Sequence, residues 1–72
     1  MKAEKRIINR ININRAAIAE LNGEEHTPIS IKEYQAEVVA SRGKECWERM
    51  VLREREQMLT EKWAKEYKDK FQ

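Results

Sequence analysis

Apolar residues recur at helical spacing through the first third of the chain. Between residues 4 and 21 they follow steps of four, seven and three, and including Asn14 turns these into alternating steps of four and three. The apolar members of this row are Ile7, Ile11, Ile18 and Leu21. Such steps are typical of one helix face that packs against a partner helix. Because Asn22 and Gly23 follow, and glycine ends many helices, the pattern predicts a helix over residues 4–21.

Residues 6–14 also fit a strand, because Ile7, Ile11 and Ile13 alternate with mostly polar side chains, and asparagine is unfavourable inside helices. In this alternative, two chains pair their strands in a ribbon-helix-helix-like arrangement, and Arg10, Asn12 and Asn14 share one face. Arginine can then read guanine, and asparagine adenine, in the major groove of DNA. We prefer the helix, since residues 15–21 are short for the first helix of such a fold.

The middle of the chain carries a connection and then a helix start. Residues 24–29 include the only proline, and Ser30 and Glu33 are spaced as a capping box, in which the two residues satisfy each other's free backbone N–H groups. The apolar residues that follow at helical spacing are Ile31, Tyr34 and Val38. The β-branched residues also allow a strand, but the cap favours a helix. Glycine inside a helix costs up to about 1 kcal/mol relative to alanine, so Gly43 is a kink, a break or a tolerated position in a helix that continues back to Ile31.

Residues 44–71 contain neither glycine nor proline and predict a helix of about 42 Å at 1.5 Å per residue. Its apolar stripe consists of Trp47, Val51, Met58, Leu59, Trp63, Tyr67 and Phe71. Acidic residues precede basic ones by four positions, in the favourable orientation, at Glu45–Arg49, Glu61–Lys65 and Glu66–Lys70.

Composition agrees with one small helical domain over residues 1–72. Hydrophobic residues make up 40% of the chain, and two glycines and one proline are few for a protein built of many short strands. The predicted fold is all-α, a helical hairpin with a long C-terminal amphipathic helix. Because that helix holds both tryptophans and the only phenylalanine, it needs a partner surface, and we expect a symmetric dimer that forms a bundle.

Charge and chemistry narrow the function classes. A net charge of +2 argues against a polyanion-binding tail, and the start of the chain does not resemble a signal or membrane segment. The single cysteine, Cys46, cannot form an internal disulfide, which is typical of a cytoplasmic protein. Cys46 also lacks an evident base, and adjacent Glu24, Glu25 and His26 seldom converge on one metal ion. We therefore expect no enzyme activity, no catalytic residue, no metal, no cofactor and no small-molecule substrate.

These observations favour a small protein–protein interaction module, an adaptor, inhibitor or regulator of the kind that phages and mobile elements encode. It would act through its aromatic C-terminal helix, on another protein or on a second copy of itself. The expected partner-binding residues are Trp47, Met50, Met58, Trp63, Tyr67 and Phe71. The alternative is a dimeric DNA-binding regulator that uses the N-terminal strand.

Overall fold

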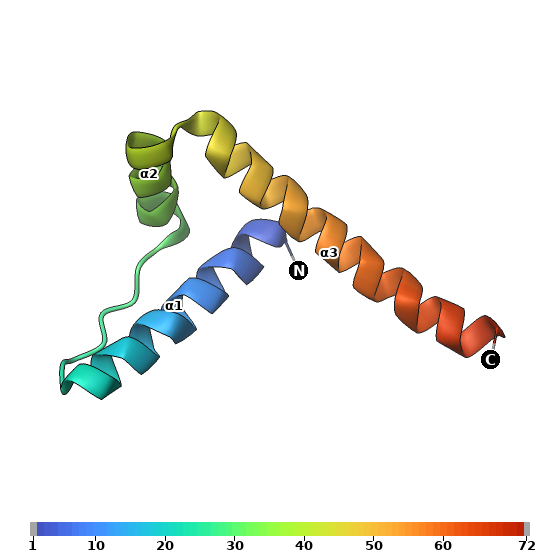
Figure 1. Cartoon of the computed structure of the whole chain (residues 1–72), viewed down its shortest axis with the longest axis horizontal. Helices are drawn as coiled ribbons and strands as arrows, with labels where there is room; N and C mark the ends of the chain where they lie inside the picture. The colour runs from blue at the N-terminus through green and yellow to red at the C-terminus, as the bar shows by residue number, and fades with distance from the viewer. Residues whose placement is uncertain (1, 72) are drawn as a thin grey trace.

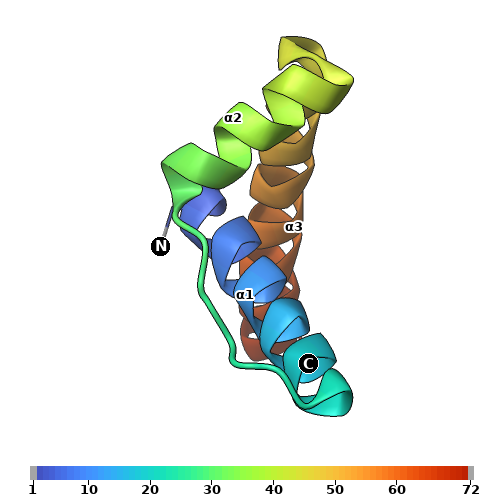
Figure 2. The same ribbon diagram turned by 90° about the vertical axis from the view of Figure 1, so that its left-hand side faces the viewer.

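A computed structural model describes residues 2–71, apart from the side chain of Phe71. It contains three helices, α1 (Ala3–Asn22), α2 (Ile31–Arg42) and α3 (Lys44–Phe71), and the described residues form no strand. The predicted all-α fold is confirmed. Figure 1 shows the N-terminal end of α1 beside the middle of α3, with the two helices diverging from there. The short α2 packs near the start of α3, and residues 23–30 run back along α1 (Figure 2).

The strand alternative for the N-terminal segment is not what the structure contains. Residues 6–14 lie inside α1, where their backbone groups form helical hydrogen bonds. The ribbon-helix-helix-like arrangement, which needs this strand, is therefore absent from the described residues. The isoleucines explain the outcome, because Ile7, Ile8 and Ile11 share one side of a helix and pack inward there, whereas a strand would split them between two faces.

The first helix ends at Gly23, as the sequence predicts. Gly23 has φ 68° and ψ 27°, and its N–H donates to the carbonyl of Glu20 at 3.2 Å. The N–H of Glu24 donates to the carbonyl of Ala19 at 2.8 Å. These two bonds form the Schellman pattern, which satisfies carbonyls that the end of a helix would otherwise leave free.

The start of α2 is also close to the prediction. The Ser30 hydroxyl accepts a hydrogen bond from the N–H of Glu33 at 3.2 Å, as an N-cap should. The second half of the capping box differs, because the Glu33 carboxylate accepts from the Ser30 hydroxyl at 3.0 Å instead of from its backbone N–H. The cap therefore supplies one backbone bond to the helix and one bond between side chains.

Gly43 separates α2 from α3 by a single residue. Its φ of 93° and ψ of 159° lie in a region that essentially only glycine adopts. Its N–H still donates to the carbonyl of Val39 at 3.0 Å, which closes the last turn of α2. Gly43 therefore breaks the helix and turns the chain sharply, so that α2 and α3 diverge from this junction (Figure 1).

A small core forms where the three helices meet. Ile7, Val38 and Trp47 come one from each helix and are buried against one another. The partly buried residues packed on this cluster are Ile11, Tyr34, Cys46, Met50 and Val51. The rings of Tyr34 and Trp47 meet edge to face with centroids 6.1 Å apart, a favourable aromatic geometry.

The connection between α1 and α2 is attached to α1 through one side chain. The Asn12 amide donates to the carbonyl of Ile29 at 3.0 Å and accepts from the N–H of Ile29 at 2.9 Å. A single asparagine thus satisfies both backbone groups of a loop residue, in the way that a neighbouring strand would. This pair of bonds positions Ser30 to begin α2.

An ionic cluster attaches α1 to the middle of α3. The carboxylate of Glu54 is buried, with 6% of the residue exposed, and it pairs with Arg10 and with Arg6, whose Nε lies 3.2 Å from Glu54 Oε2. Arg6 also makes two hydrogen bonds to Glu61, of 2.7 and 3.0 Å. At the N-terminal end, Arg55 lies 4.0 Å from Glu4. Buried carboxylates need such partners because burial removes their hydration.

The ion pair between Arg6 and Glu61 makes the attachment of α1 to α3 sensitive to acid. Its hydrogen bonds lower the pKa of Glu61 below the ordinary value of 4.5. A carboxyl whose pKa is lower in the folded state stabilises the fold above its unfolded pKa, and this contribution is lost as the pH falls through the folded pKa. The contribution is small, because both side chains are accessible to water.

We predict that Gly43→Asn destabilises the fold by roughly 1–3 kcal/mol, because asparagine does not tolerate this backbone conformation. No atom lies within 4 Å of the position an added Cβ would take, so the cost comes from the backbone alone. Gly23→Asn is the matched control, since asparagine adopts the left-handed conformation found there. Urea unfolding followed by circular dichroism measures the free energy of unfolding of both variants. A larger loss of stability for Gly23→Asn would contradict the view that Gly43 has the conformation that excludes other residues.

Glu54→Gln is expected to lower the free energy of unfolding by roughly 1.5–3 kcal/mol, because Arg6 and Arg10 lose a charged acceptor in a buried position. Glu61→Gln should cost clearly less, since that carboxylate is half exposed. Urea titrations at pH 7 compare the two. Equal losses would show that the buried carboxylate is not the main attachment of α1.

Candidate partner-binding site

The long helix α3 has two apolar faces. Successive residues turn by about 100°, so Leu52, Leu59 and Trp63 lie within about 40° of one another. Trp47 and Glu54, which face α1 and α2, lie about 140° and 160° from Leu52 on the same basis. One face of α3 therefore builds the core, and the opposite face, here called the outer face, presents large apolar side chains to solvent.

The second half of α3 extends beyond the rest of the molecule (Figure 1). From residue 59 to residue 70, every residue except Glu66 is exposed. Leu59, Trp63 and Tyr67 are 55%, 60% and 63% exposed and follow one another at steps of four. Contiguous exposed apolar surface of this kind commonly marks an interaction site.

Three of these side chains border a shallow hollow of about 930 Å³ on the distal part of α3. Thr60, Ala64 and Lys68 complete its lining, so the small side chains of Thr60 and Ala64 lie beside the large ones. The ammonium of Lys62 lies 5.9 Å from the centre of the Trp63 ring, within the range of a cation–π contact. A partner could therefore contact the aromatic rings of Trp63 and Tyr67 beside a positively charged lysine.

The structure divides the six residues that the sequence suggested for partner binding. Trp47 is only 7% exposed and belongs to the core, and Met50 packs against that core. Met58 is half-buried, whereas Trp63 and Tyr67 are exposed together on the distal part of α3. The side chain of Phe71 lies outside the described residues. Leu52 and Leu59, which the list of six omitted, lie on the outer face with Trp63.

The three residues suggested for reading DNA do not share a face. In a helix, Arg10 and Asn14 lie on one side, and Asn12 lies well over 90° away from both. Asn12 is engaged with Ile29, Arg10 is paired with Glu54, and Asn14 is exposed. The shared face required a strand, so the helical backbone removes that arrangement.

The remaining reactive side chains are placed apart. Cys46 is half-buried against the core, and His26 is exposed in the connection. Within residues 2–71, no three His, Cys, Asp or Glu side chains gather in a way that could hold a metal ion. None of the helices described is both long and apolar enough to cross a membrane.

Comparisons of the chain with protein-family models, with curated proteins and with solved structures found no match. What is known of possible function therefore comes from the placement of side chains on the three helices.

We predict that Trp47→Ala and Trp63→Ala differ sharply in stability. Loss of a buried tryptophan costs about 3–5 kcal/mol, which is enough to unfold much of a domain this small. Loss of an exposed tryptophan should change the free energy of unfolding by about 0.5 kcal/mol or less. Thermal unfolding by circular dichroism measures both, and a large loss for Trp63→Ala would show that its ring packs within the fold.

Proposed function

We propose that the protein is a small helical interaction module, an adaptor, inhibitor or regulator, that docks the distal part of α3 into a groove on another protein. The observation that carries this proposal is the exposure of Leu59, Trp63 and Tyr67 on a helix that projects from the folded body. Amphipathic helices dock in this way by inserting anchors one turn apart, and aromatic side chains are frequent anchors.

The geometry of the distal helix supports a groove as the complementary surface. Leu59, Trp63 and Tyr67 drift by about 40° per step, which gives a slightly spiralling ridge instead of a flat face. Thr60 and Ala64 leave room on one side of the ridge for partner side chains. A ridge of three large side chains matches a groove with three successive apolar pockets.

Charge supports a groove with an acidic margin. Residues 62–70 contain four lysines against Glu66 and Asp69. Glu61, just before them, is already paired with Arg6. The distal helix is therefore net positive around its apolar ridge, and acidic groups on the partner would be complementary.

A second copy of the chain is the competing occupant, and the dimer expected from the sequence stays a prediction. Two features weigh against it. Trp47 and Met50, which were expected to contribute, are used in the core of the single chain. Glu56 also lies on the outer face between Leu52 and Leu59, so that a parallel two-fold pair would bring identical carboxylates together.

Light scattering coupled to size-exclusion chromatography separates the two occupants. We expect a monomer of 8.6 kDa at concentrations up to about 100 μM, where an interface with a micromolar dissociation constant would already form a dimer. A dimer that Trp63→Ala dissociates would replace the groove with a second copy of the chain.

The partner is tested by capture from native cells with the wild type, Trp63→Ala and Leu21→Ala. Leu21 is 87% exposed on α1, so that its variant removes an exposed leucine from a different surface. We expect one protein in near-equimolar amount with the wild type and Leu21→Ala, and its loss with Trp63→Ala. Calorimetry with that purified protein should show at least a tenfold weaker dissociation constant for Trp63→Ala, since anchors commonly contribute 2 kcal/mol or more. Equal binding by both variants would refute the proposal.

A further inference from the structure

A second hollow lies between α1 and the first half of α3, at a different level of α3 from the projecting residues Leu59, Trp63 and Tyr67, here called the aromatic ridge. It has a volume of about 950 Å³, and five arginines line it. These are Arg6, Arg10, Arg42, Arg49 and Arg53. Glu54 is the only acidic residue of the lining. We call this hollow the arginine cleft.

The two kinds of basic residue are separated in space. The chain has seven arginines and eight lysines, and five of the arginines line the cleft, whereas none of the lysines does. Guanidinium groups are planar and donate two parallel hydrogen bonds to a carboxylate, whereas an ammonium acts as a point charge. The cleft is therefore suited to oxyanions and is more than a generally basic surface.

Two of the five guanidinium groups have no carboxylate partner among the described residues, and two of the other three remain largely exposed. Arg6 is fully engaged by Glu54 and Glu61, and Arg10 shares Glu54 while 60% of its side chain stays exposed. Arg49 lies 4.0 Å from Glu45, at the limit of an ion pair.

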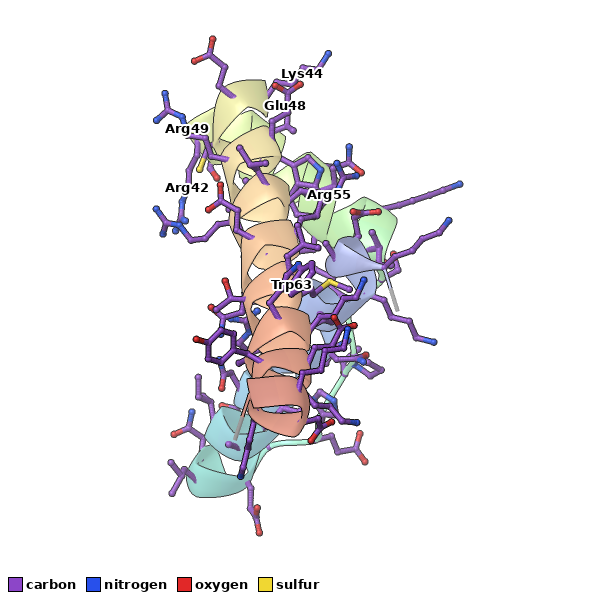
Figure 3. All side chains as sticks on the ribbon, turned by 90° about the vertical axis from the view of Figure 1, so that its right-hand side faces the viewer. Arg42, Lys44, Glu48, Arg49, Arg55 and Trp63 are labelled. Atoms are coloured by element: carbon purple, nitrogen blue, oxygen red, sulfur yellow. The ribbon has the colours of Figure 1, made fainter. Side chains whose placement is uncertain are left out.

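Among the residues that the structure describes, neither Arg42 nor Arg53 forms an ion pair. Arg42 and Arg49 project to the same side of the molecule, away from Arg55 (Figure 3). The cleft therefore presents two guanidinium groups, those of Arg42 and Arg53, for which a ligand could supply the carboxylate.

Apolar side chains also line the cleft. Among them Ile11 and Met50 are half-buried, and Ile13 is 69% exposed. The amides of Asn9 and Gln57 add neutral hydrogen-bonding groups. An occupant that matches both the apolar surface and the guanidinium groups must carry apolar and anionic groups side by side.

We infer that the arginine cleft binds an acidic amphipathic segment of another protein. Its carboxylates would face Arg42, Arg49 and Arg53, and its apolar side chains would cover Ile13 and Met50. A nucleic acid fits less well, because the chain is only +2 overall and Glu45 and Glu61 flank the guanidinium groups. The cleft shares no lining residue with the aromatic ridge, so a test of binding in the cleft is independent of the proposed function.

The probe is a fluorescein-labelled helical peptide of leucine and glutamate, about 14 residues long, titrated with the protein and followed by fluorescence anisotropy. We expect a dissociation constant of about 10–100 μM in 20 mM salt, weakening steeply by 300 mM because screening shortens the reach of charge. The double variant Arg42→Gln/Arg53→Gln should bind about tenfold more weakly. The control, Lys65→Gln/Lys70→Gln, removes the same charge outside the cleft and should bind like the wild type.

The single cysteine reports where the peptide binds. Cys46 lines the cleft and is the only thiol of the chain, so its alkylation by iodoacetamide, followed by mass spectrometry, is unambiguous. Saturating peptide should slow this reaction at least fivefold, and Trp63→Ala should leave the protection unchanged.

Three results would overturn the inference. One is a dissociation constant above about 1 mM in low salt. A second is equal binding by the arginine and lysine double variants. The third is tighter binding of a 15-nucleotide single-stranded DNA with the same arginine dependence and the same protection of Cys46, which would assign the cleft to nucleic acid.

Discussion

The arrangement of the molecule depends on one buried carboxylate. Glu54 lies near the middle of α3 and is almost inaccessible to water, so the fold must bring positive charge to it. Arg6 and Arg10, one turn apart on α1, supply that charge and determine where α1 crosses α3. Because the crossing lies at the middle of the long helix, its first half is covered by α1 and α2 and its second half is left to project.

This crossing also explains how one helix serves two environments. On the covered half, Trp47 packs with Ile7 and Val38, and the core needs no large side chain from the distal part of α3. On the projecting half, the same helical periodicity leads apolar residues onto the opposite face, where Leu59 and Trp63 meet solvent. α1 shows the same division, since Ile7 is buried near the crossing whereas Leu21 is exposed at the far end.

The helices could be predicted from the sequence because their ends depend on local chemistry. Gly23 and Ser30 act through their own backbone or a neighbour three residues away, and these two boundaries fall where they were expected. The sequence left the effect of Gly43 open between a kink, a break and a tolerated position, and the structure shows a break. The roles of the apolar residues could not be predicted in this way. Trp47 and Trp63 stand in similar local patterns, and only the position of α1, set by charges about fifty residues away along the chain, places one in the core and the other in solvent. The arginine cleft was missed for the same reason, because its members come from three helices.

The ionic cluster around Glu54 and the arginine cleft share two residues, Arg6 and Arg10. Arg6 and Arg10 favour the burial of Glu54, but the cleft also holds Arg42 and Arg53, for which the described residues supply no carboxylate. The mutual repulsion of the excess charges works against the closed arrangement of α1 and α3. A ligand that brings carboxylates to Arg42 and Arg53 removes this repulsion only in the folded state, so its binding must stabilise the fold by mass action. Binding of such a ligand would therefore stabilise the attachment of α1 to the first half of α3.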